Sequence, residues 1–199
     1  ILQISDRNSI IHKSTFNNGD FYKSFLEALD KTVEYTGREQ KLKGFFAGKF
    51  AFVGRRGLHP ELYVSDLFFT KIKQVTFDKS FLTRPKWSPS GRELIYTTYH
   101  KSGFPDMYKL DPNTGYRSIV AAFKGTNVGG IYSPSGKKIA MVLSVDGNTD
   151  LYTLSIATNR LKRISKTDAL ESNPSWSPDG RNIVFASDVL GQPQLYKIN

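Results

Sequence analysis

The sequence predicts a mainly β protein made of β-propeller blades, preceded by a short non-repeating segment with one helix. The first observation is a five-residue motif of the form aromatic-Ser-Pro-Ser/Asp-Gly, which begins at Trp87, Tyr132 and Trp176. A second marker, an apolar residue followed by tyrosine, recurs in step with it. Its tyrosines are Tyr63, Tyr108, Tyr152 and Tyr196. Repeats of about 40–45 residues with several short strands each are typical of propeller blades.

Each repeat predicts four strands, A to D. Strand A ends in the aromatic residue of the motif, and the Pro-Ser-Gly or Pro-Asp-Gly that follows turns the chain. Strand B is a nearly continuous apolar run, as expected for a strand covered on both faces. Strand C alternates apolar and polar residues, and the short polar strand D protects an exposed edge. The predicted repeats are 44–81, 82–125, 126–170 and 171–199, and strand B lies at 50–53, 94–97, 139–143 and 183–186.

The first and last repeats depart from this pattern. In the first repeat, residues 44–48 stand where the motif would be, and the last repeat stops before strand D. Because the last repeat ends in mid-blade and the chain begins without Met, we expect a fragment of a longer protein. We also expect its open flank to pack on a second copy, since closure would have covered it.

Residues 1–43 lie outside the repeat. Residues 10–16 predict a strand, and a turn is expected at 17–19. Apolar residues then recur with a helical period. This apolar stripe consists of Tyr22, Phe25, Leu26, Leu29 and Val33. Asp20 as N-cap and Gly37 after the last turn bound the helix, whose stripe we expect to pack on a sheet.

The composition limits which partners and sites the chain can have. The net charge of +10 is compatible with nucleic acid, a membrane surface or an acidic partner. The basic residues are spread thinly, however, and no nucleic-acid-binding module is present, so we interpret them as a solvated rim. Cysteine is absent, which excludes disulfides and thiolate chemistry. No apolar run reaches the length of a membrane span.

No group of residues predicts catalysis, a metal ion or a cofactor. The three histidines have neither ligand-like spacing nor a nearby carboxylate cluster, and there is no GxSxG nucleophile motif. Asp179 and Asp188 fall in predicted turns, which explain them without acid–base chemistry. We expect Trp87 and Trp176 to be buried between neighbouring blades, because a large aromatic residue at a fixed place in each repeat suits inter-blade packing.

One run in the last repeat is more specific than the motif. Residues 187–196 read Ser-Asp-Val-Leu-Gly-Gln-Pro-Gln-Leu-Tyr, and the first blade is preceded by a helix, Thr36-Gly37 and then Lys43-Gly44-Phe45. In these features most of residues 20–199 resembles the TolB family, soluble periplasmic components of the Tol–Pal envelope system. The resemblance implies that a small α/β domain precedes a six-bladed propeller. This chain would carry the end of that domain, at 1–43, and about three and a half blades.

The resemblance also implies partners and a binding surface. In the family, the outer-membrane lipoprotein Pal docks over the central opening of the propeller, on the loops that lead into strand A. The matching positions are Thr126, Asn127, Gly129, Ser172 and Asn173, with Arg84 added by repeat symmetry. The inner-membrane protein TolA is engaged by an N-terminal segment that we expect to lie outside this chain. The resemblance therefore predicts a non-enzymatic periplasmic scaffold that binds a Pal-like lipoprotein.

Two other functions remain open. Propellers of prolyl-oligopeptidase or tricorn-like peptidases carry similar repeats and gate a separate hydrolase domain. A catalytic domain with a GxSxG motif beyond Asn199 would favour that function, whereas a secretion signal with no hydrolase would favour the scaffold. A third possibility, based on the positive charge, is that the propeller binds an anionic glycan.

Overall fold

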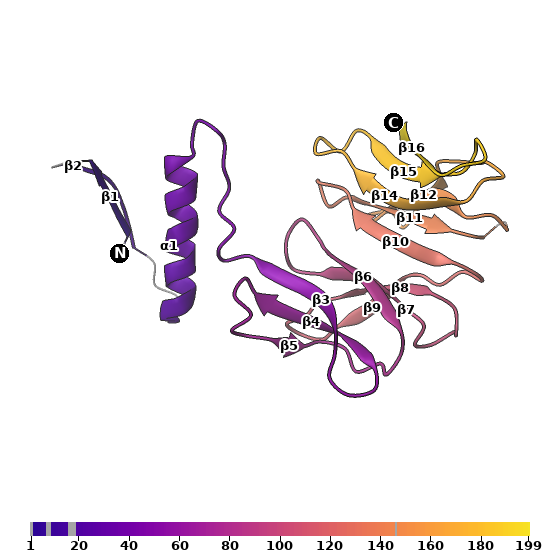
Figure 1. Cartoon of the computed structure of the whole chain (residues 1–199), viewed down its shortest axis with the longest axis horizontal. Coiled ribbons are helices and arrows are strands. Elements are labelled where there is room, and N and C mark those ends of the chain that lie inside the picture. Colours follow the sequence, from indigo (N-terminus) through magenta and orange to yellow (C-terminus); the bar gives the residue numbers. More distant parts are fainter. Residues whose placement is uncertain (1, 7–8, 16–18, 146) are drawn as a thin grey trace. The chain divides into compact units, whose positions relative to one another are not determined.

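The computed structural model describes residues 2–6, 9–15, 19–145 and 147–199 (Figure 1). The chain forms two compact units. Unit 1 comprises Ile1–Phe50 and Ser65–Ile72, and unit 2 comprises Ala51–Val64 and Lys73–Asn199. The division at residue 43 that the repeat predicts stays a prediction.

Unit 1 contains a β-hairpin and a helix. Strand β1 (Leu2–Asp6) pairs antiparallel with β2 (Ser9–Ser14), which includes most of the predicted strand. The turn predicted at 17–19 lies mostly outside the described residues. Helix α1 (Phe21–Thr36) begins after Asp20, whose carboxylate accepts a hydrogen bond from the Lys23 N–H at 3.2 Å. Asp20 is therefore the N-cap, as predicted.

The packing of helix α1 differs from the prediction. Leu26 is the one buried residue of the helix, and Phe25 keeps 50% of its surface exposed. A polar side chain of the helix instead holds the segment that follows it. The Asp30 carboxylate accepts hydrogen bonds from the backbone N–H groups of Phe46 and Ala47, at 2.5 and 3.0 Å. The predicted packing of the whole apolar stripe on a sheet is thus wrong for the described residues.

Unit 2 is built from sheets whose neighbouring strands are consecutive in the chain. The second and third sheets have four strands, and the first and fourth have three. The first sheet is β3 (Lys49–Arg55), β4 (Pro60–Asp66) and β5 (Lys73–Gln74). The second is β6 (Leu82–Trp87), β7 (Leu94–Thr98), β8 (Asp106–Leu110) and β9 (Arg117–Ala121). The third is β10 (Asn127–Tyr132), β11 (Lys138–Leu143), β12 (Asp150–Ser155) and β13 (Leu161–Arg163). The fourth is β14 (Glu171–Trp176), β15 (Ile183–Ser187) and β16 (Gln194–Ile198).

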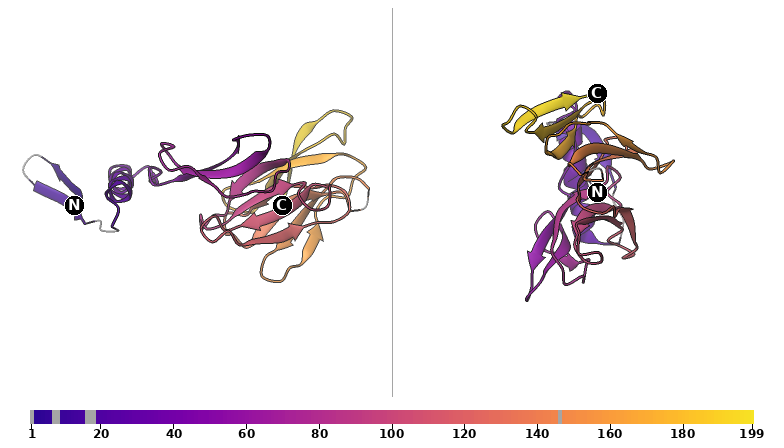
Figure 2. Two further views of the ribbon diagram at one scale, coloured as in Figure 1. Left: turned by 90° about the horizontal axis from the view of Figure 1, so that it is seen from below. Right: turned by 90° about the vertical axis from the view of Figure 1, so that its right-hand side faces the viewer.

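This arrangement confirms the predicted fold class of partial propeller blades. The second and third sheets contain strands A to D in order, and the fourth contains A to C. Successive sheets of this unit are inclined to one another instead of lying in one plane (Figure 2).

The repeated motif forms the turn between strands A and B. In the second sheet the Ser88 N–H donates to the Glu93 carbonyl at 2.8 Å, and the Gly91 N–H donates to the Ser88 carbonyl at 2.9 Å. The motif glycines have positive φ angles of 66° at Gly91 and 70° at Gly136 and Gly180. Glycine adopts this conformation without the steric penalty of a side chain, which explains why the motif ends in glycine.

Three apolar clusters join neighbouring sheets. The first contains Leu62 of the first sheet together with Leu94 and Tyr96 of the second. The other two clusters join the second sheet to the third and the third to the fourth. Their members include Ile95, Met107, Met141 and Tyr152 in one case, and Ala140, Leu151, Ile183 and Phe185 in the other. Burial of apolar surface between sheets is therefore what holds the blades together.

Strand B is buried only where a sheet lies on both sides of it. All five residues of β7 are buried, as are five of the six in β11. Strand β3 differs: Phe50 keeps 44% of its surface exposed, so the prediction of a deeply buried strand B is wrong for the first sheet. Among the described residues, no preceding blade covers β3.

The two motif tryptophans pack at the boundaries between sheets but are not fully buried. The Trp176 indole N–H donates to the backbone carbonyl of Ile131 in β10, at 3.2 Å. Both Trp87 and Trp176 are half-buried and pack against clusters shared by two sheets. Inter-blade packing is thus confirmed for Trp176, and the burial of both tryptophans is partial.

Candidate functional site

The first strands of the second, third and fourth sheets carry the same irregularity. The register of β6 with β7 shifts between Thr83 and Lys86, and β10 and β14 shift at the matching places. At these β-bulges the backbone is left-handed: φ is 59° at Arg84, 74° at Gly129 and 52° at Asn173. Left-handed backbone costs an arginine roughly 1–2 kcal/mol. Strained positions of this kind are concentrated at functional sites.

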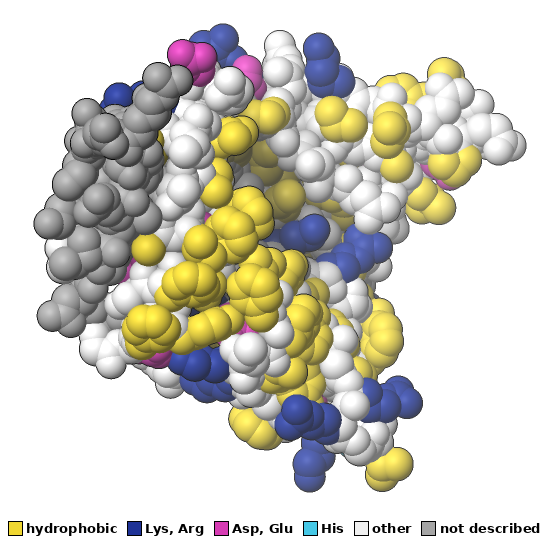
Figure 3. Space-filling model, turned by 60° about the vertical axis from the view of Figure 1, so that its left-hand side comes forward, with side chains coloured by type: hydrophobic (Ala, Val, Ile, Leu, Met, Phe, Trp, Pro, Cys, Tyr) yellow, Lys and Arg dark blue, Asp and Glu magenta, His cyan; other side chains and the backbone are white. Residues whose placement is uncertain are grey.

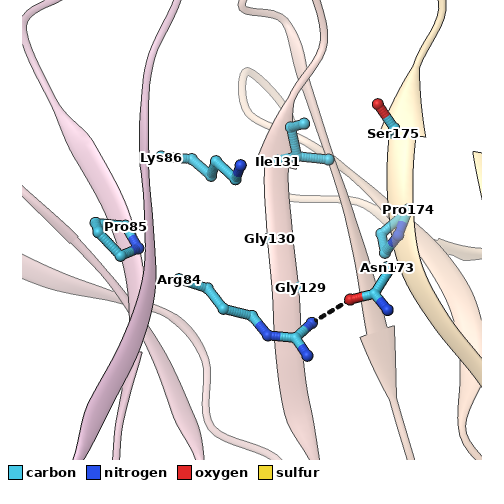
Figure 4. A pocket seen from close by; sticks show the side chains of 9 residues that line it. All are labelled: Arg84, Pro85, Lys86, Gly129, Gly130, Ile131, Asn173, Pro174 and Ser175. Atoms are coloured by element: carbon cyan, nitrogen blue, oxygen red, sulfur yellow. Dashed lines mark hydrogen bonds between the residues drawn. The ribbon is translucent and has the colours of Figure 1, made fainter. Parts of the chain in front are cut away.

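The three bulges lie along one cavity of about 480 Å³, which we call the channel cavity (Figure 4). It is lined by Arg84, Pro85, Lys86, Gly129, Gly130, Ile131, Asn173, Pro174 and Ser175. Arg84, Gly129 and Asn173 occupy equivalent positions of their strands. Two residues further along stand Lys86, Ile131 and Ser175. Because alternate residues of a strand point to the same face, both sets lie on the face of their strands that lines the cavity.

A hydrogen bond crosses this cavity. The Arg84 side chain extends from β6 across β10 and donates from Nη1 to the Asn173 Oδ1 at 2.7 Å (Figure 4). Gly129 lies on the strand between them and has no side chain to obstruct this path. A Cβ added at Gly129 would also come within 3.2 Å of the Pro174 Cδ. Because Gly129 has no side chain, β10 leaves room for the hydrogen bond between Arg84 of β6 and Asn173 of β14.

The charge of the channel cavity has one sign. Arg84 and Lys86 are its charged lining residues, and both are exposed. No acidic residue is in the lining, and neither cation forms an ion pair within the described part of the chain. On the face shown in Figure 3, Lys and Arg side chains occur in separate groups instead of one continuous patch. The cavity is thus a local positive site.

The structure brings Arg84, Gly129 and Asn173 together but gives Asn127 a different role. The Asn127 side chain is 0% exposed. Its amide donates to the carbonyls of Phe123 and Gly125, at 2.7 and 3.2 Å, and its Oδ1 accepts from the Phe123 N–H at 2.9 Å. Asn127 therefore fixes the loop that leads into β10 and offers no side-chain surface to a partner.

The remaining two predicted residues lie at the edge of this region. Thr126 is half-buried, and its N–H donates to the Ser144 Oγ at 2.7 Å. Ser172 is half-buried and precedes Asn173 in β14. Neither is among the residues that line the channel cavity. Their assignment to a partner surface stays a prediction.

Sequence reasoning missed Lys86 and Ser175. A usable signal existed: each stands two residues after a predicted site residue, and strand alternation places it on the same face. Lys86, Ile131 and Ser175 each stand directly before the motif aromatic residue of their repeat. The bulges themselves had no common signal, because arginine, glycine and asparagine occupy them.

The described residues contain no group of three or more His, Cys, Asp or Glu side chains placed to hold a metal ion. Likewise, no helix in the described part of the chain has the length and apolar character needed to cross a membrane.

Comparison with known proteins identifies the family. The model of the TolB β-propeller domain matches residues 37–199. The Tol-Pal system protein TolB of Bordetella pertussis strain Tohama I is 34% identical over 157 residues, which cover 78% of this chain and 36% of that protein. This chain therefore spans about a third of the length of this curated relative.

Solved structures agree with this result. The crystal structure of TolB from Acinetobacter baumannii superposes with a TM-score of 0.75 at 25% identity, and the match covers 87% of this chain and 44% of that one. The tricorn protease has a TM-score of 0.55 at 14% identity, over 70% of this chain and 14% of that one, which shows a common fold alone. With a family match over most of its length, the chain belongs to the TolB β-propeller family.

Proposed function

We propose that this chain is part of a periplasmic, non-enzymatic scaffold of the Tol–Pal system. Its channel cavity and adjoining loops would bind a Pal-like outer-membrane lipoprotein. The family membership supports the Tol–Pal assignment, and the observation that carries the binding site is the alignment of three bulges with left-handed backbone along one exposed cavity. Binding residues concentrate where a rigid scaffold presents irregular backbone to solvent.

The geometry supports this surface over the outer edges of the blades. Inter-sheet clusters hold β6, β10 and β14 in place, so that residues at their bulges are presented with little freedom to move. Arg84 and Asn173 are exposed and arginine is enriched in binding hot spots. The cavities that include outer-strand residues, Gln74 of β5 and Arg163 of β13, are not lined by β-bulges of neighbouring sheets.

The proposal can be tested by calorimetric titration of the full-length protein with the soluble domain of the Pal-like lipoprotein from the same organism. Ser172→Glu places a larger, charged side chain beside Asn173 and should weaken binding by about tenfold or more, equivalent to about 1.4 kcal/mol. Asn113→Glu is the matched control, because it adds the same charge to an exposed turn between β8 and β9. It should leave affinity unchanged.

Circular dichroism should show the same folded spectrum for both variants and the wild type. Equal affinities for Ser172→Glu and wild type, with Asn113→Glu weakened instead, would place the lipoprotein on the outer strands and contradict the proposal.

The alternative, a gating propeller of a peptidase, is supported only by likeness of fold to peptidases such as the tricorn protease. We expect the full-length protein to hydrolyse no peptide, ester or phosphate substrate. Peptide hydrolysis that persists through purification and disappears when a serine of the same polypeptide is replaced would favour the peptidase instead.

A further inference from the structure

The channel cavity holds two cations that point the same way, and neither has a counter-ion among the residues that the structure describes. Arg84 and Lys86 both belong to β6, and both side chains extend from that strand towards β10 (Figure 4). The other lining residues are neutral: glycine, proline, isoleucine, asparagine and serine. Two positive charges on one face of a cavity attract an anion.

Arg84 is also held ready for a ligand. Its Nη1 donates to the Asn173 Oδ1 at 2.7 Å, and this bond uses one of the five N–H donors of a guanidinium. Asn173 is neutral and therefore positions the guanidinium without cancelling its charge. A side chain that is already oriented loses less conformational entropy on binding than a free one.

We propose that the channel cavity binds a carboxylate, supplied by an aspartate or glutamate side chain in an acidic segment of the protein partner. This inference rests on the proposed function for the kind of partner, because the anionic side chains of an unmodified protein are carboxylates. A guanidinium with free N–H donors pairs with a carboxylate through charge-assisted hydrogen bonds, and the nearby ammonium adds a second positive charge. The partner would thus be recognised through acidic residues that enter the channel.

The test uses the full-length protein and two probes that need no lipoprotein: a hexaglutamate peptide and its uncharged match, hexaglutamine, both with blocked ends. Titration followed by NMR or calorimetry should show binding of hexaglutamate and none of hexaglutamine. Arg84→Gln combined with Lys86→Gln should weaken hexaglutamate binding by about tenfold or more, since hydrogen bonds to charged groups are the stronger ones.

Lys137→Gln combined with Lys138→Gln is the matched control. It removes the same amount of charge from exposed positions at the start of β11, outside the channel cavity. This control should keep hexaglutamate affinity within about twofold, apart from a small general charge effect. If both double variants lose affinity equally, the binding is non-specific attraction to a basic protein and the proposal is wrong.

Two further arms separate this inference from the proposed function. If the lipoprotein binds the wild type and the Arg84/Lys86 variant equally, the carboxylate site is wrong while the proposed function stands. If the lipoprotein does not bind the wild type but hexaglutamate binds with the expected variant pattern, the proposed partner is wrong and the carboxylate site stands. Trigalacturonate, an anionic glycan, is the last probe. If it binds more tightly than hexaglutamate and the Arg84→Gln/Lys86→Gln variant loses this binding, the cavity binds a glycan and the proposal of a protein carboxylate is wrong.

Discussion

Two of the three motif aromatic residues link their blade to the preceding one through a side-chain hydrogen bond. The Trp176 indole donates to the Ile131 carbonyl at 3.2 Å, and the Tyr132 hydroxyl donates to the Glu93 carboxylate at 3.3 Å. The Trp87 indole N–H is buried and has no hydrogen-bond partner among the described residues. In the other repeats the acceptor belongs to the preceding sheet, and for Trp176 it lies in strand A of that sheet. The first sheet, β3 to β5, begins with strand B, so a strand A that could supply the matching acceptor for Trp87 is not among its described strands.

This difference predicts unequal effects of the same substitution. Trp176→Phe removes the indole N–H and its bond to Ile131, whereas Trp87→Phe removes an N–H that is unpaired. We expect Trp176→Phe to lower the free energy of unfolding by about 1 kcal/mol more than Trp87→Phe does. Urea denaturation of both variants measures this, and equal losses would show that the hydrogen bond to Ile131 contributes nothing.

A second residue-scale prediction concerns alkaline pH. Burial raises the pKa of the Tyr96 hydroxyl to about 12 from 10.0, although the hydrogen bond from Arg117 partly opposes the shift. Because the folded-state pKa is higher than the unfolded one, this contribution to stability is complete below pH 10 and is lost as the pH rises towards 12. The change is about 2–3 kcal/mol over that window.

Tyr96→Phe removes this titration. At pH 8 the variant should be less stable than wild type by about 1 kcal/mol, because Arg117 loses an acceptor. From pH 10 to 12 the difference should shrink and then reverse. Denaturation curves at matched pH values check this, and a difference that does not change with pH would exclude Tyr96 as the titrating group.

At the residue scale, the sequence showed which residue types stand near the start of each strand A but not which of their side chains are exposed. Asn127 and Asn173 are both asparagines at the start of a strand A, and both were predicted to face a partner. One is buried and satisfies three backbone groups, while the other is exposed at a bulge. Which backbone groups a side chain can reach depends on the loop conformation, and residue type alone does not determine it.

At the element scale, the close approach of strand A to the preceding sheet depends on a glycine. Gly130 in β10 is buried, and a Cβ there would meet the side chains of Met107 and Ile95 in the second sheet, which are themselves fully buried. Gly130→Ala should therefore destabilise the protein by about 1–3 kcal/mol through overpacking.

Gly136→Ala serves as the comparison. Its added Cβ would meet nothing within 4 Å, but its φ of 70° makes alanine strained there, at a cost of roughly 1–2 kcal/mol. The first substitution costs stability through overpacking and the second through backbone strain. A second substitution, Met107→Ala, should therefore restore part of the stability lost in Gly130→Ala and none of that lost in Gly136→Ala. A double-mutant cycle that shows no coupling between positions 130 and 107 would refute close packing as the cause.

The sequence predicted strands and turns at this scale because their signals are local. Serine, proline and glycine determine the A–B turn within five residues, and apolar runs mark strand B. The bulges could not be predicted, since of Arg84, Gly129 and Asn173 only the last two are residue types that favour left-handed backbone. The half-exposed stripe of helix α1 was also missed, because helical periodicity shows which face is apolar and not what covers it.

At the scale of the whole molecule, equivalent residues differ in burial according to whether a sheet follows. Met107 in β8 and Leu151 in β12 are 0% exposed, whereas their counterpart Leu195 in β16 is 77% exposed. Leu190 is exposed as well. The repeat predicts the same apolar residue in all three places, but burial depends on the neighbouring blade. Exposed apolar surface of this kind marks a contact site.

The 199-residue chain on its own should therefore associate. Leu195→Lys and Leu190→Lys together should shift it towards the monomer, because charged side chains oppose burial of that face. Multi-angle light scattering over a range of concentrations checks this. A monomer at all concentrations, before any substitution, would contradict the expectation that the flank packs on a second copy.

We expect the lipoprotein to bind beside the bulges of β6, β10 and β14, and site-specific photo-crosslinking can detect this contact in cells. Benzoylphenylalanine would be placed in the full-length protein at Ser172 or Asn173, and at Asn113 on the outer turn between β8 and β9. After irradiation of living cells, covalent adducts with the Pal-like lipoprotein should form from Ser172 and Asn173 and not from Asn113. Adducts from Asn113 alone would contradict the account.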